Sequence, residues 1–253
     1  MNWPIVPLSK GQLLDVNPKD ILENGLYRKC DTYKGGGGYD QFPLICKKRL
    51  GTEAHQQFVV QLKGCNLDCP YCYVTREGVW GDPIRKTNEE LSAAFLESGQ
   101  EVFHLMGGAP ALRLPFWGDL MHEVFKTKGD AIFHSDLMLT ERPYDYRDLR
   151  NICYPRAIFA VNIKGLTDKE YFENTRKEID WELFWRNFSL ISTMGVPYYI
   201  TFTGCNDEKG MVEFLNEIIS RGITYDPKQA YHIDLIEYEA VKFVDEVSWG
   251  SKK

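Results

Sequence analysis

Three cysteines within eight residues are the feature of this sequence most suited to chemistry. Cys65, Cys69 and Cys72 lie in the segment Gly64–Tyr73, separated by three and then two residues. Thiolates at this spacing on a compact loop can bind one inorganic centre. A cubane iron–sulfur cluster takes four ligands, so three local cysteines would leave one iron open. An open iron is what a catalytic cluster requires, whereas an electron-transfer cluster normally takes a fourth cysteine.

The residues alone leave other roles open for this loop. One alternative is a zinc site with Cys30, Cys46 or His104 as the fourth ligand, and another is a set of structural cysteines without a metal. A disulfide framework is a poor explanation, because the chain has seven cysteines, an odd number, and no export signal. We interpret the four scattered cysteines, Cys30, Cys46, Cys153 and Cys205, as free thiols.

The cysteine loop resembles the signature of the radical S-adenosylmethionine (radical SAM) enzymes. Its Cys-x3-Cys-x2-Cys spacing is the same, and Tyr71 matches the aromatic residue that packs near the adenine. The resemblance implies that Cys65, Cys69 and Cys72 bind a [4Fe-4S] cluster, whose open iron chelates S-adenosylmethionine (SAM). It also implies an oxygen-sensitive enzyme that cleaves SAM to a 5'-deoxyadenosyl radical, which abstracts hydrogen from a substrate.

A second segment carries the same resemblance. Gly107, Gly108, Ala109 and Pro110 are similar to the family's Gly-Gly-Glu-Pro segment, which binds the methionine amino group largely through its backbone. Glycines there permit close approach of main chain to a ligand. Ala109 departs from the family pattern, which has Glu at this place. We expect SAM binding to survive this change, with less support for the loop.

Two later segments resemble those of small enzymes that activate glycyl-radical proteins. His134, Ser135 and Asp136 form the first, and Asn162 and Lys164 belong to the second. In activases the corresponding residues lie near the SAM carboxylate. Lys164 matches the activase pattern, whereas His134 and Asn162 replace acids. No residue of the chain is assigned as a catalytic acid or base.

The activase resemblance implies a protein or peptide substrate. The electron donor that we expect is reduced flavodoxin or ferredoxin. The alternative is a radical SAM enzyme that acts on a small molecule and resembles 7-carboxy-7-deazaguanine synthase, which shares a compact partial barrel.

The pattern of apolar runs predicts the elements that position these loops. From residue 58 onward, apolar runs alternate with amphipathic segments, which is typical of βαβ units and a parallel sheet. We expect six strands, at Phe58–Gly64, Glu101–Gly107, Ala131–Met138, Arg156–Lys164, Pro197–Gly204 and Tyr231–Tyr238. The predicted fold is α/β, a partial (β/α)6 TIM-like barrel over residues 58–240. Residues 1–57 are expected to form an irregular N-terminal extension, and residues 241–253 a C-terminal tail.

One side of each expected strand carries polar residues. In the fourth strand Ala157, Phe159 and Val161 share a side suited to covering helices, and Asn162 and Lys164 share the other. The polar sides of the other strands carry Gln61 with Lys63, His104 with Met106, His134 with Asp136, and Tyr199 with Thr201 and Thr203. Polar groups that face a barrel interior are costly unless water or a ligand satisfies them. We therefore expect a ligand-filled bowl that opens at the C-terminal edge of the strands.

Composition and charge restrict the partners. The chain has 253 residues, of which 43% are hydrophobic and 26% charged, as in an ordinary globular protein. Its formal net charge of −6 makes nucleic acid an unexpected partner, because proteins that grip phosphates are usually basic. The apolar runs are far shorter than the roughly 20 residues that span a bilayer. The start of the chain lacks the pattern of a signal peptide, so we expect no membrane and a reducing cytoplasm.

Overall fold

A seven-stranded sheet is the centre of the fold. The computed structural model describes residues 2–7, 26–31, 42–72, 74 and 76–233. The strand order is β2-β3-β5-β6-β7-β8-β9, in which β2 (Tyr27–Asp31) runs antiparallel to its neighbour and all other neighbours are parallel. The parallel strands are β3 (Gln56–Gln61), β5 (Val102–Met106), β6 (Ile132–Leu137), β7 (Ala157–Ile163), β8 (Tyr198–Thr203) and β9 (Ala230–Ile233).

These six parallel strands confirm the predicted barrel segments. The strands form an open sheet with no pairing between β9 and β3 among the described residues, as expected for a partial barrel. Only the start of the last expected strand can be compared, because residues 234–238 lie outside the described residues, as does the expected tail at 241–253. The remaining domain boundaries stay predictions.

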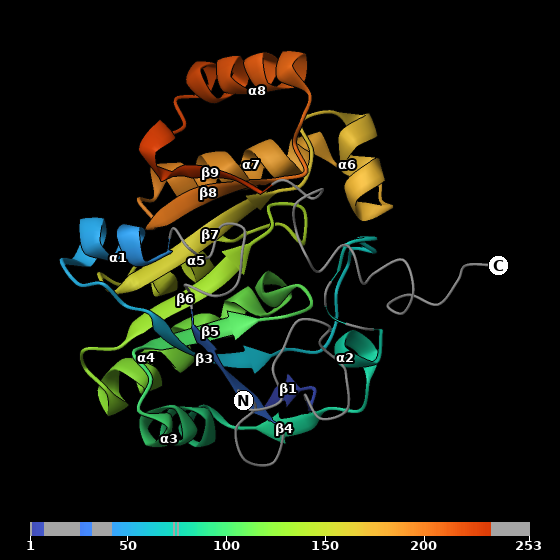
Figure 1. Cartoon of the computed structure of the whole chain (residues 1–253). Coiled ribbons are helices and arrows are strands. Elements are labelled where there is room, and N and C mark those ends of the chain that lie inside the picture. Colours follow the sequence, from blue (N-terminus) through green and yellow to red (C-terminus); the bar gives the residue numbers. More distant parts are fainter. Residues whose placement is uncertain (1, 8–25, 32–41, 73, 75, 234–253) are drawn as a thin grey trace.

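Helices connect successive strands, and most of them cover the outer face of the sheet (Figure 1). They are α2 (Arg76–Trp80), α3 (Asn88–Ser98), α4 (Trp117–Thr127), α5 (Tyr146–Ile152), α6 (Asp168–Thr175), α7 (Trp181–Thr193) and α8 (Glu208–Ser220), with 3-10 turns η4 (Pro110–Phe116) and η5 (Pro227–Gln229). Helix α3 starts at a capping box, in which the Thr87 hydroxyl accepts from the Glu90 amide and the Glu90 carboxylate accepts from the Thr87 amide. No helix in the described parts of the chain is long and apolar enough to cross a membrane.

The outer face of the sheet is apolar, as the alternation predicts. One phenylalanine from each of five neighbouring strands is fully buried there: Phe58, Phe103, Phe133, Phe159 and Phe202. The rings of Phe103 and Phe133 are stacked with their centroids 5.5 Å apart. Apolar residues of α3, α4, α7 and α8 belong to the same core. Because these side chains are buried under the helices, the alternate residues of each strand point to the inner face of the sheet.

The N-terminal segment is more regular than predicted. Strand β1 (Trp3–Ile5) pairs antiparallel with β4 (Ile84–Lys86), β2 extends the main sheet, and α1 (Phe42–Leu50) is a helix. The prediction of an irregular extension is therefore wrong for these elements. The strands are too short to show alternation, and α1 has a basic last turn and an exposed Leu44, so its apolar stripe is weak in the sequence.

Helix α1 fills the inner face of the sheet at the N-terminal ends of the strands. Its buried side chains are those of Phe42, Pro43, Ile45 and Cys46. The inner-face residues of the same apolar cluster are Val102, Ile132, Ile158, Ala160 and Tyr199. In Figure 1 this helix lies opposite the arrowheads of the parallel strands, and α2 and α6 lie near the arrowheads. The buried apolar side chains of α1 thus close one end of the bowl.

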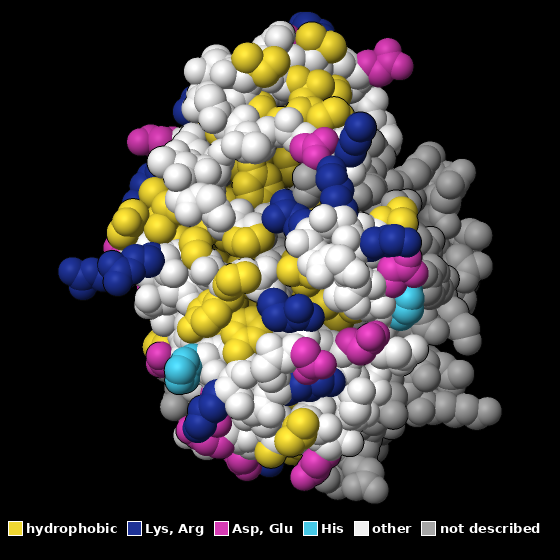
Figure 2. Space-filling model, turned by 90° about the vertical axis from the view of Figure 1, so that its left-hand side faces the viewer, with side chains coloured by type: hydrophobic (Ala, Val, Ile, Leu, Met, Phe, Trp, Pro, Cys, Tyr) yellow, Lys and Arg dark blue, Asp and Glu magenta, His cyan; other side chains and the backbone are white. Residues whose placement is uncertain are grey.

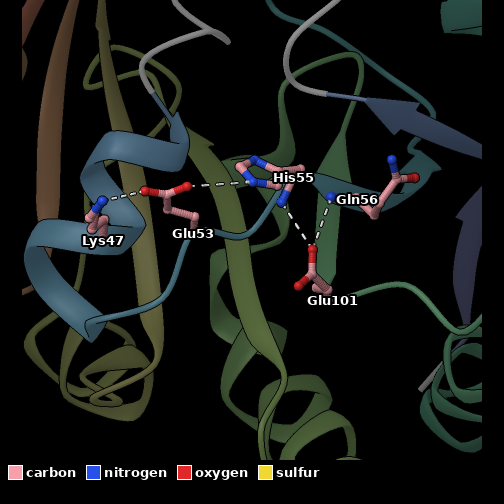
Figure 3. Close-up of polar contacts among 5 residues, drawn as sticks. All are labelled: Lys47, Glu53, His55, Gln56 and Glu101. Atoms are coloured by element: carbon pink, nitrogen blue, oxygen red, sulfur yellow. Dashed lines mark hydrogen bonds and ion pairs between the residues drawn. The ribbon is translucent and has the colours of Figure 1, made fainter.

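Polar contacts hold the connection between α1 and β3 (Figure 3). The Glu53 carboxylate forms an ion pair with Lys47 on α1 and lies 4.0 Å from His55 Nε2. The backbone amides of His55 and Gln56 both donate to Glu101, at 3.0 and 3.3 Å, just before β5. These contacts fix the loop between α1 and β3, and with it α1, at the closed end.

Figure 2 looks at this end of the molecule, where hydrophobic side chains gather over the middle of the face.

Candidate active site

The cysteine loop leaves the C-terminal end of β3 and packs against α6. Cys69 is buried, and Cys65 and Cys72 are half-buried. They pack in one cluster with Leu67, Tyr71, Met138 and Tyr171. Two backbone bonds fix the loop, from the Cys72 amide to the Cys69 carbonyl at 3.1 Å and from the Asp68 amide to the Thr175 carbonyl at 2.9 Å. The three thiols are therefore presented from one constrained loop.

Burial sets the protonation of these thiols. It raises the pKa of Cys65 and of Cys72 to about 12, and it raises the pKa of Cys69 as well. The positive charge of Lys164 opposes this rise at Cys69 and Cys72. Cysteine binds metal as the thiolate, so a cationic centre bound here would replace the protons of the three thiols. The loop therefore disfavours three uncompensated thiolates and favours thiolates that bind a cationic centre.

The described residues do not support the zinc alternative. Tetrahedral zinc with bonds of about 2.3 Å to sulfur holds its ligand atoms about 3.8 Å apart. In the described chain the three cysteine sulfurs do not form a group within 4.8 Å of one another. Cys46 lies on α1 in the apolar cluster, and His104 packs against His134, so neither joins the loop. The side chain of Cys30 is outside the described part of the chain.

The two-glycine turn after β5 packs directly on the cysteine loop. Gly107 and Gly108 have positive φ angles of 76° and 55°. A Cβ on Gly107 would lie 1.8 Å from the Gln61 amide nitrogen, and one on Gly108 would lie 1.9 Å from the Gly64 carbonyl oxygen. That carbonyl accepts from the Ala109 amide at 2.8 Å. Only glycine allows this close approach, and the buried Ala109 and Pro110 then start η4.

Two histidines meet on the inner face of the sheet. His104 of β5 and His134 of β6 are paired in the sheet register, and their ring centroids lie 4.2 Å apart. The Tyr199 hydroxyl bonds His134 Nε2 at 3.0 Å. Burial lowers the pKa of His134 to about 3 and raises that of Asp136 to about 6, against the opposing charge of Lys164. The histidine is therefore neutral at physiological pH.

Lys164 links this inner face to the cysteine loop. Its ammonium donates to the Tyr71 hydroxyl at 3.1 Å and lies 5.1 Å from the centroid of that ring. Asn162 accepts from the Thr203 hydroxyl at 2.9 Å. Both predicted residues thus lie on the same side of the sheet as Asp136, in agreement with the register. The polar side expected for β7 is where the sequence predicts it.

Ser135 does not take part in this arrangement. The register places it opposite Leu105 and Phe159, on the face covered by helices. Its hydroxyl donates to the Leu105 carbonyl at 2.9 Å, and the residue is fully buried. Strand alternation sends neighbouring side chains to opposite faces, so His134 and Asp136 reach the bowl and Ser135 does not. The prediction of Ser135 as a SAM-binding residue finds no geometric support.

Several buried polar atoms of the inner face have no hydrogen-bond partner in the described structure. They are the side-chain amides of Gln57 and Gln61, the Thr201 hydroxyl and His134 Nδ1. Buried polar groups are normally hydrogen-bonded, because each unsatisfied group costs about 1–3 kcal/mol. Their accumulation on one face indicates a surface that is completed by ligand or water. This supports the predicted bowl.

Sequence reasoning missed Glu141. This residue is in the loop after β6, buried, and electrostatically coupled to Asp136 and Cys65. Burial, with the nearby charge of Asp136, raises the pKa of Glu141 well above its usual value, against the Ala111 backbone and Lys164. An acid in an irregular loop carries no periodic signal, so only the structure brings it to the site.

Residues 59–218, more than half of the chain, match the family model of the radical SAM superfamily. The chain belongs to this superfamily. The structure of anSMEcpe with bound AdoMet shares the fold with a TM-score of 0.52 at 16% identity, over 68% of this chain and 48% of that chain. The structure of TYW1 with a lysine-pyruvate adduct bound has a TM-score of 0.50 at 12% identity, over 80% of this chain and 77% of that chain. No curated protein matches the sequence.

The family model defines the superfamily of this chain, and the two solved structures show its fold. The chain spans about half the length of anSMEcpe, so specific substrates do not follow from that similarity. Radical SAM enzymes use a [4Fe-4S] cluster and SAM, and these are the cofactors of the family. The residues present fit both groups. Three clustered thiols offer iron ligands, and the unpartnered polar atoms offer hydrogen bonds to a polar ligand.

Proposed function

We propose that Cys65, Cys69 and Cys72 hold the catalytic cluster of this radical SAM enzyme. The observation that carries the proposal is the contact between two loops. The cysteine loop follows β3, and the Gly107–Gly108 turn packs against its first residue, Gly64, while Lys164 contacts Tyr71 of the same loop. A cofactor that touches iron and is bound by backbone must lie where such loops meet. When bound, the cluster and SAM supply a 5'-deoxyadenosyl radical that abstracts hydrogen from the substrate.

The chain's own residues have distinct roles in this proposal. Gly107 and Gly108 present their backbone to the amino group of SAM. A side chain at either position would collide with Gln61 or Gly64, so only glycine allows the turn to lie this close to the cysteine loop. Lys164 supplies a positive charge for the SAM carboxylate and is oriented by Tyr71. Apolar side chains, including those of Leu67 and Met138, border the cysteine loop and limit the access of water.

Anaerobic incubation with dithionite and SAM tests the proposal. The reconstituted wild-type chain should release 5'-deoxyadenosine. Cys69→Ala should contain less iron and sulfide and form no 5'-deoxyadenosine above background. Cys153→Ala is the matched control, because Cys153 is exposed at the end of α5. Wild-type rates in the Cys69 variant would overturn the ligand assignment.

The inner face favours a small polar substrate. Gln61 and Thr201, near the C-terminal ends of β3 and β8, present buried polar atoms without partners, which a small molecule with several hydrogen-bonding groups could satisfy. This corresponds to the small-molecule alternative that resembles 7-carboxy-7-deazaguanine synthase. A protein or peptide substrate, which the activase resemblance implies, stays a prediction. Deuterium transfer into 5'-deoxyadenosine from labelled candidates distinguishes the two.

An electron donor completes the reaction. Reduced flavodoxin or ferredoxin is the donor that we expect, and each can replace dithionite in the same assay. SAM cleavage that one of them supports in the absence of dithionite would support the assignment, whereas failure of both to replace dithionite would contradict it.

A further inference from the structure

We propose that His104, His134 and Asp136 form a second metal site, for a divalent transition-metal ion, on the inner face of the sheet. One ligand atom from each of these three side chains lies within 4.8 Å of the other two. Both histidines are almost completely buried, and Asp136 is half-buried. The site is separate from the cysteines and does not depend on the cluster assignment.

The strand register is the first observation that supports the site. His104 and His134 occupy paired positions on neighbouring strands, and Asp136 follows His134 by two residues on the same face. Parallel strands lie about 4.8 Å apart, so side chains at paired positions converge on one point. The backbone therefore places three ligating groups together without any loop rearrangement.

The state of His134 is the second observation. Its Nδ1 has no hydrogen-bond partner, although the residue is 1% exposed. Its Nε2 is held by the Tyr199 hydroxyl, so Nδ1 is the nitrogen left to bind a metal. Histidine ligands in proteins commonly bind metal through one nitrogen while the other bonds a neighbouring group that orients the ring.

The surrounding charges are compatible with a dication. Asp136 supplies one negative charge, and the carboxyl group of Glu141 is electrostatically coupled to it. Lys164 is the opposing positive charge near Asp136. On the closed side, the Phe42 ring of α1 lies 4.5 Å from the His134 ring and shields the site. The bowl side is polar.

The donor set indicates the kind of metal and its use. Two imidazoles and a carboxylate suit zinc, iron(II) or cobalt(II) rather than magnesium or calcium, which prefer oxygen ligands. Three protein ligands leave coordination positions open, as in catalytic rather than structural sites. An ion here could bind an oxygen or nitrogen atom of a substrate and fix it in the bowl.

Zinc binding to the full chain tests this proposal. The test uses a variant with Cys65, Cys69 and Cys72 changed to Ser, so that zinc cannot bind to the thiols of the cysteine loop. After desalting, elemental analysis should find about one zinc ion per chain. His104→Gln, His134→Gln and Asp136→Asn in that background should each lower zinc affinity at least tenfold. Zinc content that is lost with the cysteines, or unchanged in all three variants, would overturn the site.

Two further variants separate ligation from a general loss of structure. Tyr199→Phe keeps the ring and removes the hydroxyl that orients His134, so zinc affinity should fall about tenfold or more. His122→Gln, at an exposed position of α4, should leave it unchanged. Cobalt(II) added to the same background should give the visible spectrum of nitrogen and oxygen ligation. Circular dichroism confirms that each variant is folded, and an effect of His122→Gln equal to that of His134→Gln would contradict the assignment.

Discussion

The inner face of the sheet has two ends with opposite character. At the N-terminal ends of the strands, Phe42 and Ile45 of α1 pack against Val102 and Ile132, and the space is filled by apolar side chains. At the C-terminal ends the same face carries histidine, aspartate and lysine, and several buried polar atoms lack partners in the described structure. The difference shows that the helix supplies stability at one end and leaves the other end for ligands.

Removing the apolar filling should have the largest effect on stability. Phe42 is fully buried, so Phe42→Ala leaves a cavity and should lower the free energy of unfolding by about 3–5 kcal/mol. Leu44 of the same helix is 57% exposed, and Leu44→Ala should cost about 0.5 kcal/mol. Urea unfolding of the two variants measures this contrast. Equal losses would mean that α1 does not fill the bowl.

The glycine turn should be the most sensitive point of the ligand end. Gly108→Ala meets both a positive φ of 55° and the Gly64 carbonyl oxygen at 1.9 Å. Gly51→Ala has a similar φ of 71° but no atom within 4 Å of the added Cβ. The control should therefore cost only the left-handed conformation, about 1–2 kcal/mol. Gly108→Ala should lower the free energy of unfolding by more than Gly51→Ala does and should abolish SAM cleavage. Full activity in the Gly108 variant would show that the close approach of the two loops is not needed.

Lys164 should affect SAM binding more than stability. A charged hydrogen bond is worth about 1.5–3 kcal/mol, so Lys164→Met should raise the dissociation constant of SAM about 10- to 100-fold. Lys169→Met removes an exposed lysine of α6 and should leave it unchanged. Anaerobic equilibrium dialysis with labelled SAM gives both values. Unchanged affinity in the Lys164 variant would place the SAM carboxylate elsewhere.

A matched pair of threonines gives the smallest and most specific contrast. The Thr201 hydroxyl is buried without a partner, whereas that of Thr175 donates to the Tyr171 carbonyl at 2.6 Å. Thr201→Val should therefore raise the stability of the cofactor-free chain by about 1 kcal/mol, and Thr175→Val should lower it by a similar amount. Thermal unfolding without cofactors checks the signs. A loss of stability in both variants would mean that the Thr201 hydroxyl is satisfied.

The parallel strands and their inward polar residues could be predicted from the sequence, because alternation within a strand is a strong local signal. His134, Asp136, Asn162 and Lys164 all lie on the predicted side of the sheet. Ser135 was assigned from a resemblance of three consecutive residues, and alternation places it on the other face. A linear motif does not say which of its side chains share a face.

Helix α1 and Glu141 could not be predicted, for different reasons. Most apolar residues of the helix are consecutive, at 42–46, so they do not stand out as a stripe at helical spacing. The helix becomes stable by packing against strands far along the chain, which a local pattern does not reveal. Glu141 reaches the site through a loop whose path is set by tertiary packing. The pairing of His104 with His134 also needs the strand order, although each residue alone fits its strand.

The electron paramagnetic resonance spectrum of the reduced cluster tests the central claim most directly. That claim is that three thiols hold a cluster with one open iron beside the glycine turn. Addition of SAM to the reconstituted, dithionite-reduced chain should change the cluster signal, because SAM binds the open iron. A chain that assembles no cluster, or a signal that is identical with and without SAM, would contradict the account.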